Sequence, residues 1–173
     1  MYQRPDLYLK RIFDNVDRDR SGSIDAQELQ AALSNGTFLP FNPETVISLI
    51  GMFDRNNSGK IGFNEFKDLW RYVTDWERVF RSFDRDNSGN IDFNELKQAL
   101  ASFGYRLSDF TISNILRRFD KHGDGTLYFD DFIQCLVVLH NITAEFSQID
   151  TNRDGRIYIH YEQLLNMFVN TKV

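Results

Sequence analysis

A short acidic motif recurs five times along the 173 residues of this chain, and this repeat constrains the fold more than any other feature. The string Asp-x-Asp/Asn-x-Ser-Gly begins at Asp17, Asp54 and Asp84, and a weaker form, Asp-x-x-x-Asp-Gly, begins at Asp120 and Asp150. The five aspartates are separated by 37, 30, 36 and 30 residues. A recurring spacing of this size indicates a chain built from repeated supersecondary units.

The spacing between the motifs predicts where the helices lie. A long gap leaves room for two helices and a turn, whereas a short gap suits one helix shared by neighbouring loops. Apolar residues at helical spacing, without a breaker, predict single helices over residues 66–83 and 131–149. Asn35 and Gly36 should end an earlier helix, and Asn42 should cap the next. We therefore expect an all-α fold of five helix-loop-helix hands in one domain over residues 1–173.

The loops that the motifs begin have the residue pattern of calcium sites. Calcium takes six to eight oxygens, which a twelve-residue loop supplies from positions 1, 3, 5, 7, 9 and 12, with Gly at position 6 for the sharp turn and Glu at position 12 as a bidentate ligand. The first and third loops meet every requirement, with Asp25 and Asp92 at position 9, and should bind calcium most tightly. Their predicted ligands are Asp17, Asp19, Ser21, Ser23 and Glu28 in the first loop and Asp84, Asp86, Ser88, Asn90 and Glu95 in the third.

The second loop lacks one side-chain oxygen, because Gly62 stands at position 9. We expect calcium to bind there with lower affinity than in the first and third loops. Its predicted ligands are Asp54, Asn56, Ser58, Lys60 through the backbone carbonyl, and Glu65.

The fourth and fifth loops depart further from the pattern. The fourth has His122 at position 3, Tyr128 at position 9 and the shorter Asp131 at position 12, so it should be weak or empty at cellular calcium. The fifth has Tyr161 at position 12, with Glu162 one place late, and should bind only at high calcium. The predicted ligands of the fifth loop are Asp150, Asn152, Asp154 and Arg156.

Short β-pairings between loops should join the hands. Residues 23–25 can pair with residues 60–62, and residues 90–92 with residues 126–128, so that hands 1 and 2 and hands 3 and 4 form pairs. Residues 156–158 have no partner left, and an unpaired strand edge invites another chain. A second copy related by a two-fold axis is the simplest partner, a related five-hand chain is an alternative, and folding of the last helix onto its own core is another. The predicted dimer residues are Ile157, Tyr158, Leu164, Leu165 and Phe168.

With five hands rather than four, the sequence resembles the penta-EF-hand family over essentially the whole chain. Residues 33–37, 40–43, 84–89, 103–109, 130–134 and 161–163 carry this likeness. The resemblance implies an all-helical fold, dimerisation through the fifth hand and calcium-dependent binding of Pro-rich segments of partner proteins. The complete first loop favours one subgroup of the family over the sorcin-like subgroup, whose first loop is irregular.

The chain is rich in aromatic residues, with 16 Phe, 7 Tyr and 2 Trp, and aromatic side chains suit a peptide-binding surface. Tyr72 and Trp76 are among these aromatic residues. We hypothesise that calcium in the third loop moves Arg106 and opens an apolar groove for Pro-rich peptides, whose preformed helix loses little entropy on docking. The alternative is that these aromatics form ordinary core. The predicted peptide-binding residues are Trp70, Phe103, Tyr105, Arg106 and Tyr161.

Composition narrows the remaining classes of function. The net charge of −5 argues against nucleic acid as the main partner. The single cysteine, Cys135, fits a cytoplasmic protein, with calcium-dependent recruitment to membranes or the nucleus as an extension. The sequence contains no nucleophile–base pattern, phosphate loop or zinc motif, so we expect a calcium sensor and adaptor and not an enzyme. A calcium-dependent regulatory subunit, a sorcin-like modulator and a calcium buffer are the alternatives.

Overall fold

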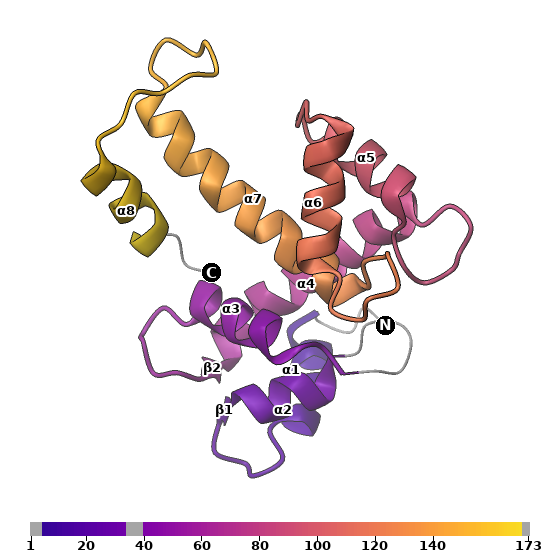
Figure 1. The fold of residues 1–173 in the computed structure, drawn as a ribbon. Coiled ribbons are helices and arrows are strands. Elements are labelled where there is room, and N and C mark those ends of the chain that lie inside the picture. The colour runs from indigo at the N-terminus through magenta and orange to yellow at the C-terminus, as the bar shows by residue number, and fades with distance from the viewer. Residues whose placement is uncertain (1–4, 34–39, 171–173) are drawn as a thin grey trace.

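The computed structural model of the protein describes residues 5–33 and 40–170 (Figure 1). These residues form mainly helices, with two very short strands, which confirms the predicted all-α class. The elements are α1 (Pro5–Val16), β1 (Ser23–Ile24), α2 (Ala26–Ala32), α3 (Pro43–Phe53), β2 (Ile61–Gly62), α4 (Phe63–Phe83), α5 (Phe93–Ser102), α6 (Asp109–Phe119), α7 (Phe129–Ile149) and α8 (Tyr161–Asn170).

The two longest helices are each shared by two hands, as the spacing of the motifs predicted. Helix α4 leaves the second loop and enters the third, and α7 leaves the fourth loop and enters the fifth, each over 21 residues. Asn42 caps α3 by accepting a hydrogen bond from the Thr45 N–H, and Pro43 follows as its first residue, as predicted. Helix α2 ends at Ala32, and the predicted stop at Asn35 and Gly36 lies outside the described residues.

The loops pair through single apolar residues at their eighth positions. Strands β1 and β2 are antiparallel with Ile24 opposite Ile61, and an isolated bridge joins Ile91 to Leu127. All four side chains are fully buried, so each pairing is also part of the core. Hands 1 and 2 and hands 3 and 4 therefore pair as predicted, and residues 156–158 belong to no strand or bridge in the described part of the chain.

Phenylalanines dominate the centre of the molecule. Phe13 meets Phe66 edge-on with ring centroids 5.5 Å apart, and Phe80 meets Phe132 in the same way at 5.5 Å. Cys135 is buried among these residues, and burial raises the pKa of its thiol to about 12. Cys135 therefore acts as a packing residue of the core.

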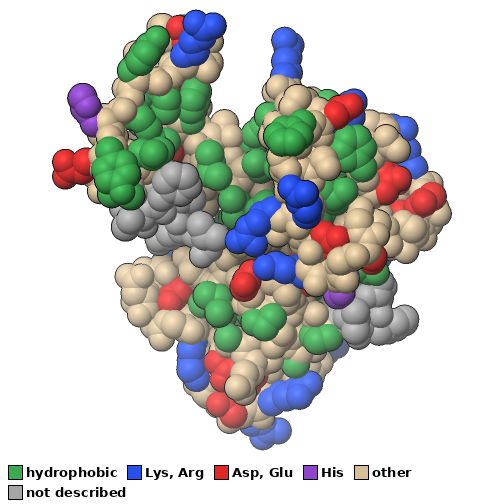
Figure 2. Space-filling view, in the orientation of Figure 1, with side chains coloured by type: hydrophobic (Ala, Val, Ile, Leu, Met, Phe, Trp, Pro, Cys, Tyr) green, Lys and Arg blue, Asp and Glu red, His purple; other side chains and the backbone are tan. Residues whose placement is uncertain are grey.

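The fifth hand projects from this body as an arm made of the end of α7, the fifth loop and α8 (Figure 1). Hydrophobic side chains gather on its surface, at the upper left of Figure 2. Tyr158 is 95% exposed and Tyr161 76% exposed, and Leu164 and Leu165 are also exposed. The side chain of Phe168 lies outside the described residues. None of the helices in the described ranges 5–33 and 40–170 combines the length and the apolarity needed to span a membrane.

Candidate functional site

The first loop is folded around Asp17, which follows the last residue of α1 and is buried. The Ser21 N–H donates to Asp17 Oδ1 and the Gly22 N–H to Asp17 Oδ2, both at 2.9 Å. Gly22 has a φ of +84°, which a residue without Cβ adopts readily, so the chain can turn here. These bonds fix the carboxylate of Asp17 on the inner side of the loop.

The same loop is closed by Glu28, the third residue of α2. Its two carboxylate oxygens accept hydrogen bonds from the N–H groups of Arg18, at 2.8 Å, and Asp25, at 3.1 Å. Asp25 in turn caps α2 by accepting from the Glu28 N–H at 3.0 Å, which completes a capping box. As a result, carboxylate oxygens of Asp17, Asp19 and Glu28 lie within 4.8 Å of one another.

The third loop repeats this arrangement with its own residues. Glu95 accepts from the N–H groups of Arg85, at 2.8 Å, and Asp92, at 3.0 Å, and carboxylate oxygens of Asp84, Asp86 and Glu95 again lie within 4.8 Å. Three hard oxygen donors at this separation suit Ca²⁺. The two loops with the complete sequence pattern are therefore the two whose carboxylates converge.

Hydrogen bonds from Ser21 and Ser88 keep the third-position carboxylates of these loops ionised. The backbone of Ser21 lowers the pKa of Asp19, and the Ser88 side chain and backbone lower the pKa of Asp86. Both carboxylates therefore remain negatively charged below the usual titration range of aspartate, which favours cation binding.

The second loop closes in the same way with fewer acidic groups. Glu65 accepts from the N–H groups of Arg55, at 2.9 Å, and Gly62, at 2.7 Å. Asn56 takes the place of the second aspartate and accepts from the Ser58 N–H at 2.9 Å. Asn56 offers a neutral amide oxygen and Gly62 has no side chain. The loop is therefore closed like loops 1 and 3 but has only two carboxylates.

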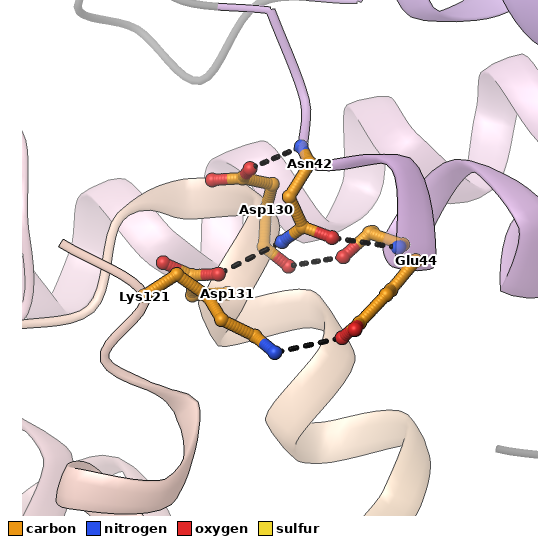
Figure 3. A network of polar contacts seen from close by, with 6 residues as sticks. Asn42, Glu44, Lys121, Asp130 and Asp131 are labelled. Atoms are coloured by element: carbon orange, nitrogen blue, oxygen red, sulfur yellow. Dashed lines mark hydrogen bonds and ion pairs between the residues drawn. The ribbon is translucent and has the colours of Figure 1, made fainter.

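The fourth loop differs in the direction of its twelfth residue. The side chain of Asp131 accepts a hydrogen bond from Asn42 Nδ2 at 2.8 Å, at the start of α3 (Figure 3). Asp124 is engaged within the loop by the Thr126 hydroxyl at 2.7 Å and the Tyr128 hydroxyl at 3.0 Å. Loop 4 thus uses its acidic side chains for protein contacts, in keeping with the weak site that the sequence predicts.

Burial beside a second carboxylate raises the pKa of Asp131. Desolvation, with a further contribution from the charge of Asp130, raises the pKa of Asp131 to about 7. At this pKa, proton binding competes with cation binding at Asp131 in neutral solution.

The fifth loop is two residues longer than the others before its exit helix begins. Helix α8 starts at Tyr161, and the His160 N–H donates to Gln163 Oε1 at 2.8 Å. In loop 1 the equivalent N–H, of Asp25, donates to Glu28. The residue that closes loop 5 is therefore the neutral Gln163. A twelve-residue loop predicts the closing position at Tyr161, and this prediction is wrong because loop 5 has two additional residues before α8.

Comparison with known proteins agrees with this geometry. The EF-hand domain pair family matches residues 6–71 and 73–136, and the EF hand family matches residues 143–157. The sorcin of Schistosoma japonicum is 52% identical over 157 residues, which cover 91% of each chain. The peflin of Danio rerio is 40% identical over 163 residues, which cover 94% of this chain and 60% of peflin.

A solved structure of a homolog of programmed cell death 6 protein from Leishmania major Friedlin superposes with a TM-score of 0.85. It is 34% identical and the match covers 95% of this chain and 94% of that one. The chain belongs to the penta-EF-hand family. Calcium is accordingly its cofactor, because the EF-hand matches coincide with the acidic loop clusters.

Within the penta-EF-hand family, the complete first loop predicts a likeness to the subgroup of programmed cell death protein six, with sorcin and grancalcin as the alternative. Relatives from both subgroups match: the Leishmania structure represents the first, and the Schistosoma sorcin and mouse grancalcin, 41% identical over 150 residues covering 84% of this chain and 67% of grancalcin, represent the second. The protein therefore lies close to both.

This penta-EF-hand protein does not bring the predicted peptide-binding residues into one groove. Trp70 lines a cavity of about 310 Å³ together with Phe41 and Phe80. Phe103 and Tyr105 line a different cavity, of about 400 Å³. Arg106 is exposed beside them, and Tyr161 lies on the arm.

Trp76 also lines the second cavity. Its ring packs edge-on against Tyr72, with centroids 6.0 Å apart, and against Phe103, at 5.8 Å. Trp76 is one of the aromatic residues noted in the sequence, but it is not among the predicted peptide-binding residues. Its spacing of four residues from Tyr72 on one helix, which places both on the same face, was the available signal.

Proposed function

We propose that this protein is a calcium sensor that binds Pro-rich segments of other proteins in the cavity around Trp76. The observation that carries the proposal is the lining of that cavity. Tyr72 and Trp76 of α4 form one wall with Phe103 and Tyr105, and aromatic surfaces of this kind suit the extended helix of Pro-rich peptides. Met52 of α3 and Leu136, Val137, His140 and Asn141 of α7 complete the lining.

The cavity is linked to the third calcium loop through the two helices that flank the loop, α4 and α5. Phe83 immediately precedes Asp84, and Phe103 is the C-cap of α5, the exit helix of the loop. The two rings pack edge-on with centroids 5.9 Å apart. A change in the angle between α4 and α5 on calcium binding would therefore move Phe103 relative to Trp76, and with it the cavity.

The ligands that would hold calcium are the residues predicted from the sequence. In loops 1, 2 and 3 the converging or closed carboxylates support that assignment, and in loop 5 Asp150, Asn152 and Asp154 stand without an acidic closing residue. We propose that loops 1 and 3 fill first, loop 2 next and loop 5 last.

Titration calorimetry with a synthetic Pro-rich peptide, with and without calcium, tests the proposed function. We expect binding only with calcium, and we expect Trp76→Ala to weaken it at least about tenfold, since burying an aromatic ring dominates many interfaces. Trp70→Ala is the matched control, because Trp70 lies on the same helix and lines the other cavity. Calcium binding without peptide binding, or equal effects of the two variants, would contradict the proposal.

The exposed arm supports a second proposal, that two five-hand chains associate through hand 5. Residues 156–158 offer an unpaired edge, and Tyr158, Leu164 and Leu165 are exposed beside it. A homodimer is the simplest assembly, and a related five-hand chain would use the same surface. Light scattering should give a dimer at micromolar concentration, and Tyr158→Asp with Leu165→Asp should give a monomer. A wild-type monomer under these conditions would exclude the homodimer.

We further propose a cytoplasmic location with calcium-dependent recruitment to membranes or the nucleus. The single, buried cysteine supports a compartment where disulfides are not needed. Fractionation of cells before and after a rise in calcium would test this, and a constant distribution would contradict the recruitment.

A further inference from the structure

A buried polar contact joins the start of α3 to the start of α7 (Figure 3). The backbone N–H of Asn42 donates to Asp130 Oδ2 at 2.7 Å, and its side-chain Nδ2 donates to Asp131 Oδ1 at 2.8 Å. The Thr45 hydroxyl adds a longer bond, of 3.3 Å, to the carbonyl of Asp130. Hand 2 and hand 4 are thus tied together by residues that are 88 and 89 positions apart in the sequence.

The two carboxyl groups in this contact are almost completely buried. Asp130 is 2% exposed and Asp131 1% exposed. Within the described part of the chain, Asp130 Oδ1 and Asp131 Oδ2 have no hydrogen-bond partner. Burying two incompletely paired carboxyl groups costs free energy, so this contact holds the two helices together at the expense of stability. Such a contact is better explained by the arrangement it fixes than by its contribution to stability.

The arrangement it fixes includes both sides of the cavity around Trp76. Met52 lies near the end of α3, and Val137 and His140 lie further along α7, all three in the lining of that cavity. Because each helix is rigid, the position at which their starting ends are joined governs the separation of these lining residues.

We propose that Asn42, Asp130 and Asp131 form a latch that positions α3 against α7 and so sets the width and affinity of the peptide pocket. This proposal rests on the proposed function, although the latch itself is defined by the helix arrangement. The three residues are positioning residues, because none of them lines the pocket.

Several charged and titratable groups surround the latch. Glu44 and Lys121 form an exposed ion pair at 2.7 Å on its outer side, with Arg118 close to Glu44. His122 faces Asp131 from the fourth loop and favours its ionised form, whereas Asp130 opposes it. The hydrogen bond from Asn42 also favours the ionised form of Asp131, and burial opposes it most strongly.

A distance measurement tests the latch without any peptide. Spin labels attached through Met52→Cys and His140→Cys report the separation of α3 and α7. The native Cys135 will not compete for label, because it is fully buried and burial raises the pKa of its thiol to about 12. We expect one narrow distance distribution in the otherwise wild-type chain. In Asn42→Asp we expect a broader or shifted distribution, because this variant keeps the helix cap but places a third carboxyl group beside those of Asp130 and Asp131.

Three further variants guard against a simple loss of folding. Asn42→Ser also keeps a capping oxygen, adds no charge and removes only the Nδ2 donor, so it should broaden the distribution less than Asn42→Asp. Glu44→Gln removes the exposed ion pair at the same junction and should leave the distribution unchanged. Asp131→Asn, which can still accept from Asn42 without a charge, should also preserve it. An unchanged distribution in both Asn42 variants would overturn the latch.

Peptide calorimetry on the same unlabelled variants, without the cysteine substitutions, then tests the positioning role. We expect Asn42→Asp to weaken binding about tenfold while calcium binding at loops 1 and 3 is retained. A shifted distance with unchanged peptide affinity would overturn the positioning role. Absence of peptide binding by the wild-type chain would reject the proposed function instead, and the distance measurement would still decide the latch.

Discussion

In loop 1 the closing residue, Glu28, approaches Asp17 and Asp19, whereas in loop 4 the closing residue, Asp131, approaches Asn42 on another hand. Both residues stand third in a helix that follows an EF-hand loop. Glutamate is one methylene longer and can bring both oxygens to an ion at the loop centre, which aspartate reaches less well. The comparison teaches that a loop which loses its calcium ligands can keep its fold while its acidic residues serve a contact between hands.

The largest effect should come from removing the closing glutamates. Glu28→Ala and Glu95→Ala each delete two oxygens of the six to eight that calcium needs, so each should abolish one high-affinity site in calorimetry. Asp131→Ala, at the equivalent position of loop 4, should remove none. Loss of a site in Asp131→Ala equal to that in Glu28→Ala would break the comparison.

The stability of the protein should depend more on Asn42, which contacts Asp131, than on an ordinary helix cap. Asn42→Ala removes a helix cap and a hydrogen bond to a buried carboxyl group, and should lower the free energy of unfolding by about 2 to 4 kcal/mol. Ser108→Ala removes an exposed cap from α6, where Ser108 accepts from the Thr111 N–H at 3.3 Å, and should cost about 1 kcal/mol. Denaturation in urea measures both, and equal losses would show that Asn42 acts only as a cap.

The pH dependence of stability should single out Asp131. Its pKa is raised from 3.8 to about 7 in the folded protein, so the folded state binds more protons than the unfolded state between these values. The free energy of unfolding should therefore fall as pH rises from about 4 to about 7 and change little above that range. Asp131→Asn should lack this contribution, and the difference between the two unfolding curves, measured without calcium, isolates it. Parallel curves would mean that Asp131 titrates normally.

The smallest effect should come from the closing residue of loop 5. Gln163→Glu restores a carboxylate at the position where His160 N–H already finds its partner. We expect a modest gain in calcium affinity at that loop, visible at millimolar calcium, without a change at loops 1 and 3. Glu162→Gln, one residue earlier, is the control and should have no effect on the loop.

Local patterns predicted much of this molecule. The two shared helices, the pairing of Ile24 with Ile61 and of Ile91 with Leu127, and the converging carboxylates of loops 1 and 3 all follow from the repeated loop motif and its spacing. The contact between Asn42 and Asp131 could not be predicted in this way, because it depends on how two hands pack. The separation of Trp70 from Trp76 has the same origin, since a shared helix presents different faces to different partners.

The late start of α8 was not accessible from the sequence either. Gln163 suits the third position of a helix, but His160 is not one of the residues, Ser, Thr, Asp or Asn, that mark a helix cap in sequence.

Helix α4 has a mechanical consequence for calcium sensing. Its 21 residues give it a length of about 30 Å, with Glu65 of loop 2 near one end and Asp84 of loop 3 just beyond the other. A continuous helix acts as a lever, so a tilt of about 5° at one end displaces the other by about 3 Å over this length. The second and third calcium sites therefore share one helix. We expect that filling one of them would change the helix angle from which the other must close.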